Sequence, residues 1–228
     1  MDLKGAENKI GLKFNDEGLL KQAFTHRSYL NENKNTGLEH NERLEFLGDA
    51  VLELVVTDYL FAKYPKKPEG ELTALRSALV NSVMLATLGT ELDFNTYLLL
   101  SRGEAKDTGR ARQYILANTF EAVVGAIYLD GGYDAAKDFI TRSLLPKTNE
   151  IEEKRLWVDA KSYFQEKAQE RVGITPAYKT LKESGPDHDK EFTVGLFLGD
   201  ALIAEGAGKS KQEAEQDAAR NGLEVKKW

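Results

Sequence analysis

The stretch His40–Tyr64, HNERLEFLGDAVLELVVTDYLFAKY, constrains the fold of this chain more than any other. Its spacing predicts one long helix, which ends where Pro65 follows. Spacings of three and four residues place four carboxylates on a single face: Glu42, Glu45, Asp49 and Glu53. The residues beside that face are almost all apolar, as in a buried helix. Buried carboxylates must be paired, protonated or metal-bound, whereas the alternative is a solvated acidic edge.

A second helix-length segment favours a metal site over a solvated acidic edge. Arg112–Leu129, RQYILANTFEAVVGAIYL, is nearly all apolar after Gln113, yet Asn118 and Glu121 share one of its faces. The small residues Ala117, Ala122 and Gly125 would let another helix approach closely. Oxygen ligands from two buried helices are what a divalent-cation site in a helical domain requires. With oxygen donors only, Mg²⁺ or Mn²⁺ is favoured over Zn²⁺.

Bulk properties exclude several other classes of protein. The 228 residues include no Cys, so disulfides, thiolate catalysis and Cys-based zinc sites are excluded. The N-terminus shows no signal peptide and no apolar run is long enough for a membrane span, so we expect a cytoplasmic protein with no membrane contact. The net charge of −6 is shared by both parts of the chain, so any polyanion must be held by local patches.

The first 150 residues read as an all-α domain. We expect two short helices before residue 30, with Asn15 capping the segment from Asp16 to His26. Beyond the central helix, one further helical segment spans Glu71–Leu92. The ligand-bearing helix should close at Asp130-Gly131-Gly132, before an amphipathic helix over Tyr133–Leu145.

The pattern changes after a polar, charged linker over residues 149–157, for which a helical conformation is an alternative. A helix over Asp159–Val172 precedes three strand-like segments and a closing helix, which gives a small α+β domain of order α-β-β-β-α. The expected strands are Ala177–Lys182, Glu191–Leu198 and Ala201–Glu205, and the closing helix is Ser210–Val225. Ser210 and Glu213 match a capping box directly after the glycine-rich turn Gly206-Ala207-Gly208-Lys209. Lys209 and Lys211 at this helix start suit a phosphate, although solvated surface lysines would give the same pattern.

These motifs together resemble the ribonuclease III family. HNERLEFLGDAVLEL is similar to its signature segment, and FTHRSY, PEGELTALRSALV and ILANTFEAVVGAIYLDGGY follow the family's other motifs in order. The tail from about Asp159 resembles a double-stranded-RNA-binding domain. The resemblance implies an endonuclease domain over residues 1–148, a linker over 149–157 and an RNA-binding domain over 158–228.

The resemblance also implies site residues and a reaction. It assigns metal ligands to Glu45, Asp49, Asn118 and Glu121, with Glu42 and Glu69 as further catalytic acids. The implied reaction is Mg²⁺-dependent hydrolysis of double-stranded RNA, giving 5′-phosphate and 3′-hydroxyl ends with short 3′ overhangs. Mn²⁺ should substitute, and neither an organic cofactor nor a covalent nucleophile is implied. Family members process structured precursors such as ribosomal RNA, and they are homodimers in which the residue matching Phe46 inserts into the partner. A core phenylalanine at position 46 fits the sequence equally well.

For the tail of the chain, the resemblance to a double-stranded-RNA-binding domain implies that A-form RNA is recognised by its shape. Gln165, Glu166 and Gln169 would face one minor groove, Pro186 and His188 the next, and Lys209 and Lys211 the phosphates between them.

Two departures from the family pattern concern these sites. Asn118 stands where the best-known members carry Asp, which leaves three carboxylates and predicts weaker metal binding. Gln212 replaces one lysine of the usual basic run, and Lys209 lies close enough to substitute for its charge. The alternative function is a non-cleaving RNA-binding protein whose metal site is weakened by Asn118.

Overall fold

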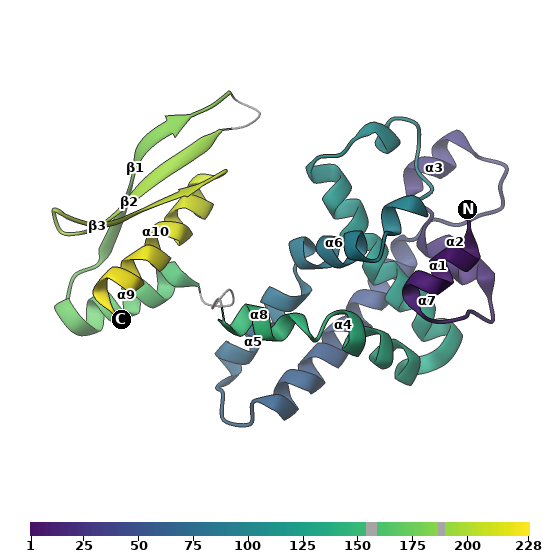
Figure 1. Ribbon diagram of the computed structural model, residues 1–228, viewed down its shortest axis with the longest axis horizontal. Coiled ribbons are helices and arrows are strands. Elements are labelled where there is room, and N and C mark those ends of the chain that lie inside the picture. The colour runs from purple at the N-terminus through teal and green to yellow at the C-terminus, as the bar shows by residue number, and fades with distance from the viewer. Residues whose placement is uncertain (154–158, 187–189) are drawn as a thin grey trace. The chain divides into compact units, whose positions relative to one another are not determined.

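The computed structural model describes residues 1–153, 159–186 and 190–228. The chain divides into two compact units, Met1–Trp157 and Val158–Trp228, and each has its own apolar core (Figure 1). Among the described residues, no single helix is long and apolar enough to cross a membrane. The bent pair Glu69–Val80 and Ser82–Glu91 meets that test jointly, by length and composition only.

The first unit is a helical domain, as the sequence predicts. Its longest elements are α4 (Glu42–Lys63) and α7 (Arg110–Ser143), which pack against each other and form the centre of the core. The remaining described helices surround this pair: α1 (Leu3–Ile10), α2 (Glu17–Ala23), α3 (Arg27–Glu32), α5 (Glu69–Val80), α6 (Ser82–Glu91) and α8 (Lys147–Glu153), with 3₁₀ turns at Phe94–Thr96 and Glu104–Lys106.

Several expected helix boundaries were wrong, and the helix expected to reach His26 ends at Ala23, before the separate helix α3. The single helix expected over Glu71–Leu92 is split into α5 and α6 by Asn81, whose extended ψ of 158° bends the chain by 42°. The Asn81 side chain caps α6 by accepting from Met84 N at 2.9 Å, a capping preference that the apolar periodicity concealed. The cap of α2 is Asp16 rather than Asn15, because Asp16 accepts from Gly18 N at 2.8 Å.

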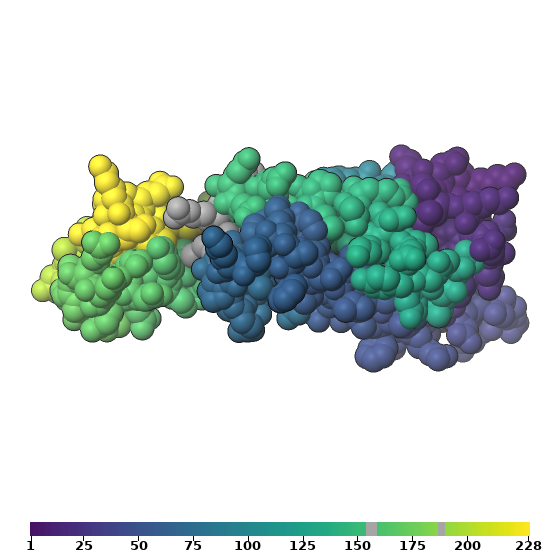
Figure 2. All heavy atoms as spheres, turned by 90° about the horizontal axis from the view of Figure 1, so that it is seen from below, coloured from purple at the N-terminus to yellow at the C-terminus, as the bar shows by residue number. Residues whose placement is uncertain are grey.

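The break expected in the second ligand-bearing helix is confirmed. Gly132 has φ 78° inside α7, a conformation that only glycine adopts without strain, so the helix divides there. Asp130 next to the break accepts from the backbone N–H groups of Asn15 at 2.9 Å and Asp16 at 2.8 Å. These bonds join the N-terminal residues to α7, and Figure 2 shows the two segments side by side in purple and green.

The expectation that α4 is buried nearly all round was wrong on one side. Phe46, Leu54 and Phe61 are 82%, 57% and 73% exposed, and Ala50 between them is exposed as well. The opposite side packs on α7 and is fully buried at Leu52 and Val56. A single copy of the chain therefore leaves an apolar stripe of α4 uncovered.

Part of the segment expected to be a linker is helical and packed. In α8, Thr148 and Ile151 are buried, and Ile151 joins the core of the first unit. Lys147 pairs with Glu91 of α6 at 2.6 Å, and Glu152 lies 3.6 Å from Lys63 of α4.

The second unit is the expected α-β-β-β-α domain. Its described elements are α9 (Ala160–Val172), β1 (Pro176–Ser184), β2 (Glu191–Leu198), β3 (Ala201–Gly208) and α10 (Lys211–Lys226). The strands form an antiparallel sheet of order β1-β2-β3, and both helices pack on one face through Phe164, Leu196 and Ala218. Half of the predicted capping box is present: Ser210 Oγ accepts from Glu213 N at 3.2 Å, but Glu213 accepts from Lys209 N at 2.9 Å.

Candidate active site and RNA-binding surface

The candidate active site lies where the backbones of α4 and α7 touch. A Cβ atom on Gly48 would stand 1.8 Å from the carbonyl oxygen of Glu121, and one on Gly125 would stand 2.2 Å from that of Leu44. No other residue fits at either position without moving a helix. The close approach expected at Gly125 is confirmed, whereas the sequence analysis missed its partner Gly48. A glycine inside a long helix costs about 1 kcal/mol, which is a signal that could have been used.

This contact brings together the carboxylates of the two helices. Burial raises the pKa of Glu121 to about 8, and the nearby charges of Asp49 and Glu45 add to the rise. Burial likewise raises the pKa of Glu45, with Glu42 and Asp49 contributing, while a hydrogen bond from the Asn118 side chain opposes the rise. Burial and the charge of Glu53 raise the pKa of Asp49. Glu45 and Asp49 of α4 thus face Asn118 and Glu121 of α7.

The donor atoms of this cluster suit a hard divalent cation. They are carboxylate and amide oxygens, and a cation between them would relieve the repulsion that raises their pKa values. Among the residues that the structure describes, however, no three carboxylate or imidazole groups are close enough together to hold one ion. The cluster therefore fits a metal by its chemistry, and side-chain rotation would be needed to close a ligand set.

The two further acids suggested by the sequence lie apart from each other. Glu42 is the first residue of α4, where it raises the pKa of Glu45 and pairs with Arg27 at 3.3 Å. Glu69 begins α5 and accepts a hydrogen bond from Thr73 at 2.9 Å. In one chain Glu69 lines a separate pocket between α4 and α5, together with Thr57, Phe61 and Arg76.

In the second unit, the residues expected to contact RNA are on the surface. Gln165, Glu166 and Gln169 are exposed along α9 and line a shallow trough with Ser162 and Glu170. Pro186 is exposed after β1, and His188 lies outside the described residues.

The two lysines at the start of α10 have acidic neighbours that the sequence analysis missed. Lys209 lies 3.5 Å from Glu191 of β2, and Lys211 lies 3.0 Å from Glu183 of β1. The glycine segment expected as a turn is the end of β3 instead. The sheet register sets both glutamates beside it, because Glu183 is paired with Phe192, the neighbour of Glu191, and Phe192 is paired with Gly208. Phosphates would have to compete with these carboxylates for the lysines.

Comparison with known proteins identifies both units. Residues 16–148 match the family model described as ribonuclease-III-like, and residues 160–226 match the double-stranded RNA binding motif. The chain belongs to the ribonuclease III family. Proteins named ribonuclease 3 from Pelotomaculum thermopropionicum and Carboxydothermus hydrogenoformans are each 46% identical to it. The first alignment covers 95% of this chain and 90% of the relative, and the second covers 99% and 96%.

A solved structure supports the fold of the first unit. The nuclease domain of ribonuclease III from Campylobacter jejuni matches 64% of this chain and 99% of its own, with 38% identity and a TM-score of 0.58. That structure is described as showing flexibility in a region involved in dimer formation of the nuclease domain. As a member of the ribonuclease III family, the chain is a ribonuclease with a double-stranded-RNA-binding domain, from a metal-dependent family. The non-cleaving alternative is not favoured.

Proposed function

We propose that this ribonuclease III is a cytoplasmic, Mg²⁺-dependent homodimer that cuts double-stranded RNA in structured precursors such as ribosomal RNA. Its products would carry 5′-phosphate and 3′-hydroxyl ends with short 3′ overhangs. One observation carries the proposal. Glu45 and Asp49 of α4 lie opposite Glu121 of α7, where Gly48 and Gly125 let the two helices touch. Such coupled carboxylates in a family of nucleases are suited to binding cations at a phosphodiester.

In this proposal, Glu45, Asp49, Asn118 and Glu121 hold Mg²⁺, and Mn²⁺ can replace it. The bound ion would supply charge neutralisation at the phosphodiester and activation of water. Glu121 must lose its proton to bind the ion, since its pKa of about 8 leaves it largely protonated at neutral pH. Asn118 supplies a neutral oxygen and fixes Glu45 through its hydrogen bond. Glu42 and Glu69 are proposed as outer acids of the site.

The RNA-binding domain would hold the duplex by its shape. Gln165, Glu166 and Gln169 would contact one minor groove, and the loop with Pro186 and His188 the next. Lys209 and Lys211 would contact phosphates across the major groove, after exchanging their glutamate partners for the RNA. Because few cations take part, the salt dependence should be modest.

The homodimer is supported by the uncovered stripe of α4. Phe46 is 82% exposed, and Ala50, Leu54 and Phe61 continue its line, because steps of four, four and seven residues return to the same side of a helix. Exposed apolar patches of this kind mark interfaces in soluble proteins.

The test is cleavage of a long, fully paired RNA while Mg²⁺ is titrated across the millimolar range. The parent, Glu121→Gln and Asn118→Asp proteins would be compared. We expect the parent to cut, Glu121→Gln to be inactive, and Asn118→Asp to need less Mg²⁺ than the parent, because a fourth carboxylate strengthens the site.

A parent that binds the RNA but leaves it intact at every Mg²⁺ and Mn²⁺ concentration would refute the proposal. Equal Mg²⁺ requirements of the parent and Asn118→Asp would remove Asn118 from the ligand set. Far-ultraviolet circular dichroism of all three proteins controls for folding.

A further inference from the structure

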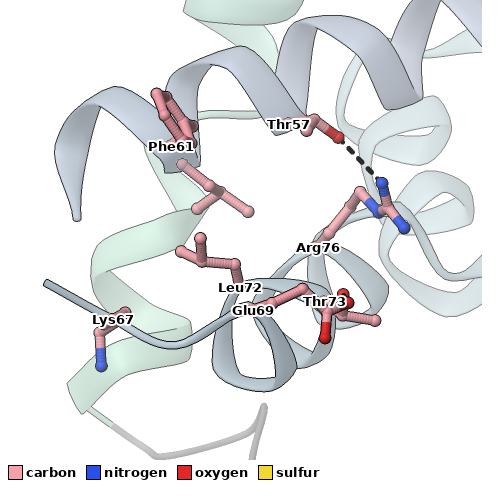
Figure 3. Close-up of a pocket in the computed structure, with 8 residues that line it drawn as sticks. Thr57, Phe61, Lys67, Glu69, Leu72, Thr73 and Arg76 are labelled. Carbon is pink, nitrogen blue, oxygen red and sulfur yellow. Dashed lines mark hydrogen bonds between the residues drawn. The ribbon is translucent and has the colours of Figure 1, made fainter. Parts of the chain in front are cut away.

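A pocket between α4 and α5 combines an apolar lining with a guanidinium group. Its volume is about 430 Å³, and Leu60 and Leu72 give it an apolar lining. Figure 3 shows the side chains of both helices around this space, with Arg76 bonded to Thr57. The remaining lining residues are Thr57, Phe61, Lys67, Glu69, Thr73 and Arg76.

Arg76 is the unusual residue of this pocket. Its guanidinium donates to Thr57 Oγ1 at 3.0 Å, and it is ion-paired to no carboxylate in the described parts of the chain. Lys67, by contrast, already pairs with Glu71 at 2.7 Å. A half-buried guanidinium with a single neutral acceptor retains four N–H donors for another molecule.

The pocket and the exposed Phe46 lie at opposite ends of the same stripe. Phe46 begins the stripe, Leu54 is near its middle, and Thr57 and Phe61 end it at the pocket. In a two-fold dimer the same patch meets itself. Two stripes that crossed antiparallel near Leu54 would place the Phe46 ring of one copy over the pocket of the other, because Leu54 lies midway between Phe46 and Phe61.

The charge of Arg76 agrees with this arrangement, and the carboxylate that also lines the pocket, Glu69, accepts a hydrogen bond from Thr73 at 2.9 Å. Asp49 lies three residues after Phe46, on the adjoining face of α4, and it has no ion pair in the described parts of the chain. When Phe46 enters the pocket, Asp49 and its neighbouring carboxylates approach Arg76 of the other copy.

We infer that Arg76 acts in trans, as a positioning residue that pairs with the partner's Asp49 and thereby orders the partner's carboxylate cluster. The inference rests on the proposed homodimeric nuclease and names a residue that each subunit lends to the other. Each active site is then incomplete in a single chain.

Two mixed dimers test whether Arg76 acts in trans. Both carry one Arg76→Ala and one Glu121→Gln substitution, and they differ only in which copy carries each. Each is made as two copies joined by a flexible linker, so that assembly does not depend on affinity. The first joins an Arg76→Ala copy to a Glu121→Gln copy. The second joins an unchanged copy to an Arg76→Ala/Glu121→Gln copy. The linked pair of unchanged and Glu121→Gln copies is the reference with one working site.

If Arg76 acts in trans, the first dimer keeps one complete site and nicks one RNA strand at the reference rate. The second dimer has no complete site and should be about tenfold slower, the effect expected for one lost charged hydrogen bond. The opposite pattern, or equal rates, overturns the inference. Arg76→Lys in place of Arg76→Ala keeps the charge and controls for loss of structure.

A second readout does not depend on cleavage. Sedimentation equilibrium in metal-free buffer gives the dimer dissociation constants of the unlinked parent, Arg76→Ala, Asp49→Asn and double-variant proteins. We expect each single change to alter the constant and the double variant to add little, because both remove the same pair. Additive effects overturn the inference even if the parent proves inactive, whereas an inactive parent by itself refutes only the proposed function.

Discussion

Gly48 of α4 lies directly against the carbonyl oxygen of Glu121 in α7, at a point where a Cβ atom would come within 1.8 Å. This backbone contact sets the separation between the two halves of the carboxylate cluster. It also explains why α4 tolerates a glycine in its interior, since any side chain there would force the helices apart.

Gly48→Ala should therefore destabilise the first unit and abolish RNA cleavage. We expect a loss of about 3 kcal/mol in the free energy of unfolding, because the added methyl group meets backbone that cannot rotate away. Urea unfolding and the cleavage assay measure the two effects. Gly70→Ala in α5 is the matched control, since its added methyl group meets nothing within 4 Å, and it should be neutral or stabilising by up to about 1 kcal/mol. Similar effects of the two substitutions would contradict the steric argument.

The stability of the metal-free protein should fall as the pH rises through the range of Glu121. Its pKa is raised from 4.5 to about 8 in the folded protein, so the folded state holds more protons than the unfolded state between these values. The stabilisation is complete below pH 4.5 and is lost by about pH 8. Thermal unfolding with a chelator from pH 5 to 9 should show a shallower decline for Glu121→Gln. Parallel curves for the two proteins would show that Glu121 is not perturbed.

Removing an acidic partner of Lys211 should strengthen RNA binding. Glu183→Gln frees the lysine that Glu183 holds at 3.0 Å, and it removes a negative charge that would face the phosphates. We expect binding to be about two- to fivefold tighter, the range of an exposed ion pair. Binding would be measured without Mg²⁺, using a short RNA duplex. Glu91→Gln, which breaks the Lys147 pair in the first unit, should leave RNA affinity unchanged. Weaker binding by Glu183→Gln would refute competition between the carboxylate and RNA.

The segment α8 should stabilise the first unit. Ile151 is 1% exposed and joins its core, so Ile151→Ala should cost about 2–5 kcal/mol of unfolding free energy. Val83→Ala on α6, where the side chain is 67% exposed, should cost less than about 1 kcal/mol. Equal costs would mean that the helix adds no packing energy and that the linker begins near residue 149, as the resemblance implies.

Much of the candidate site could be predicted because its residues repeat at helical spacing. Glu45 and Asp49 share a face of α4, and Asn118 and Glu121 share a face of α7. The division of α5 from α6 was missed because Asn81 interrupts the helix without disturbing its apolar periodicity. Glu69 was assigned to the site by resemblance alone. In a single chain it lines the pocket between α4 and α5 and not the carboxylate cluster.

The sequence by itself determined the helical domain, the α-β-β-β-α domain and the acidic faces, because local spacing and capping specify these. The family followed from the resemblance of its motifs. Only the tertiary structure decided how closely α4 and α7 approach, which side of α4 stays uncovered and which glutamates hold Lys209 and Lys211. Each of these depends on residues distant in sequence that meet only after folding. The pairing of Glu121 with the carboxylates of α4 is of this kind, since it exists only because Gly48 and Gly125 allow two backbones to touch.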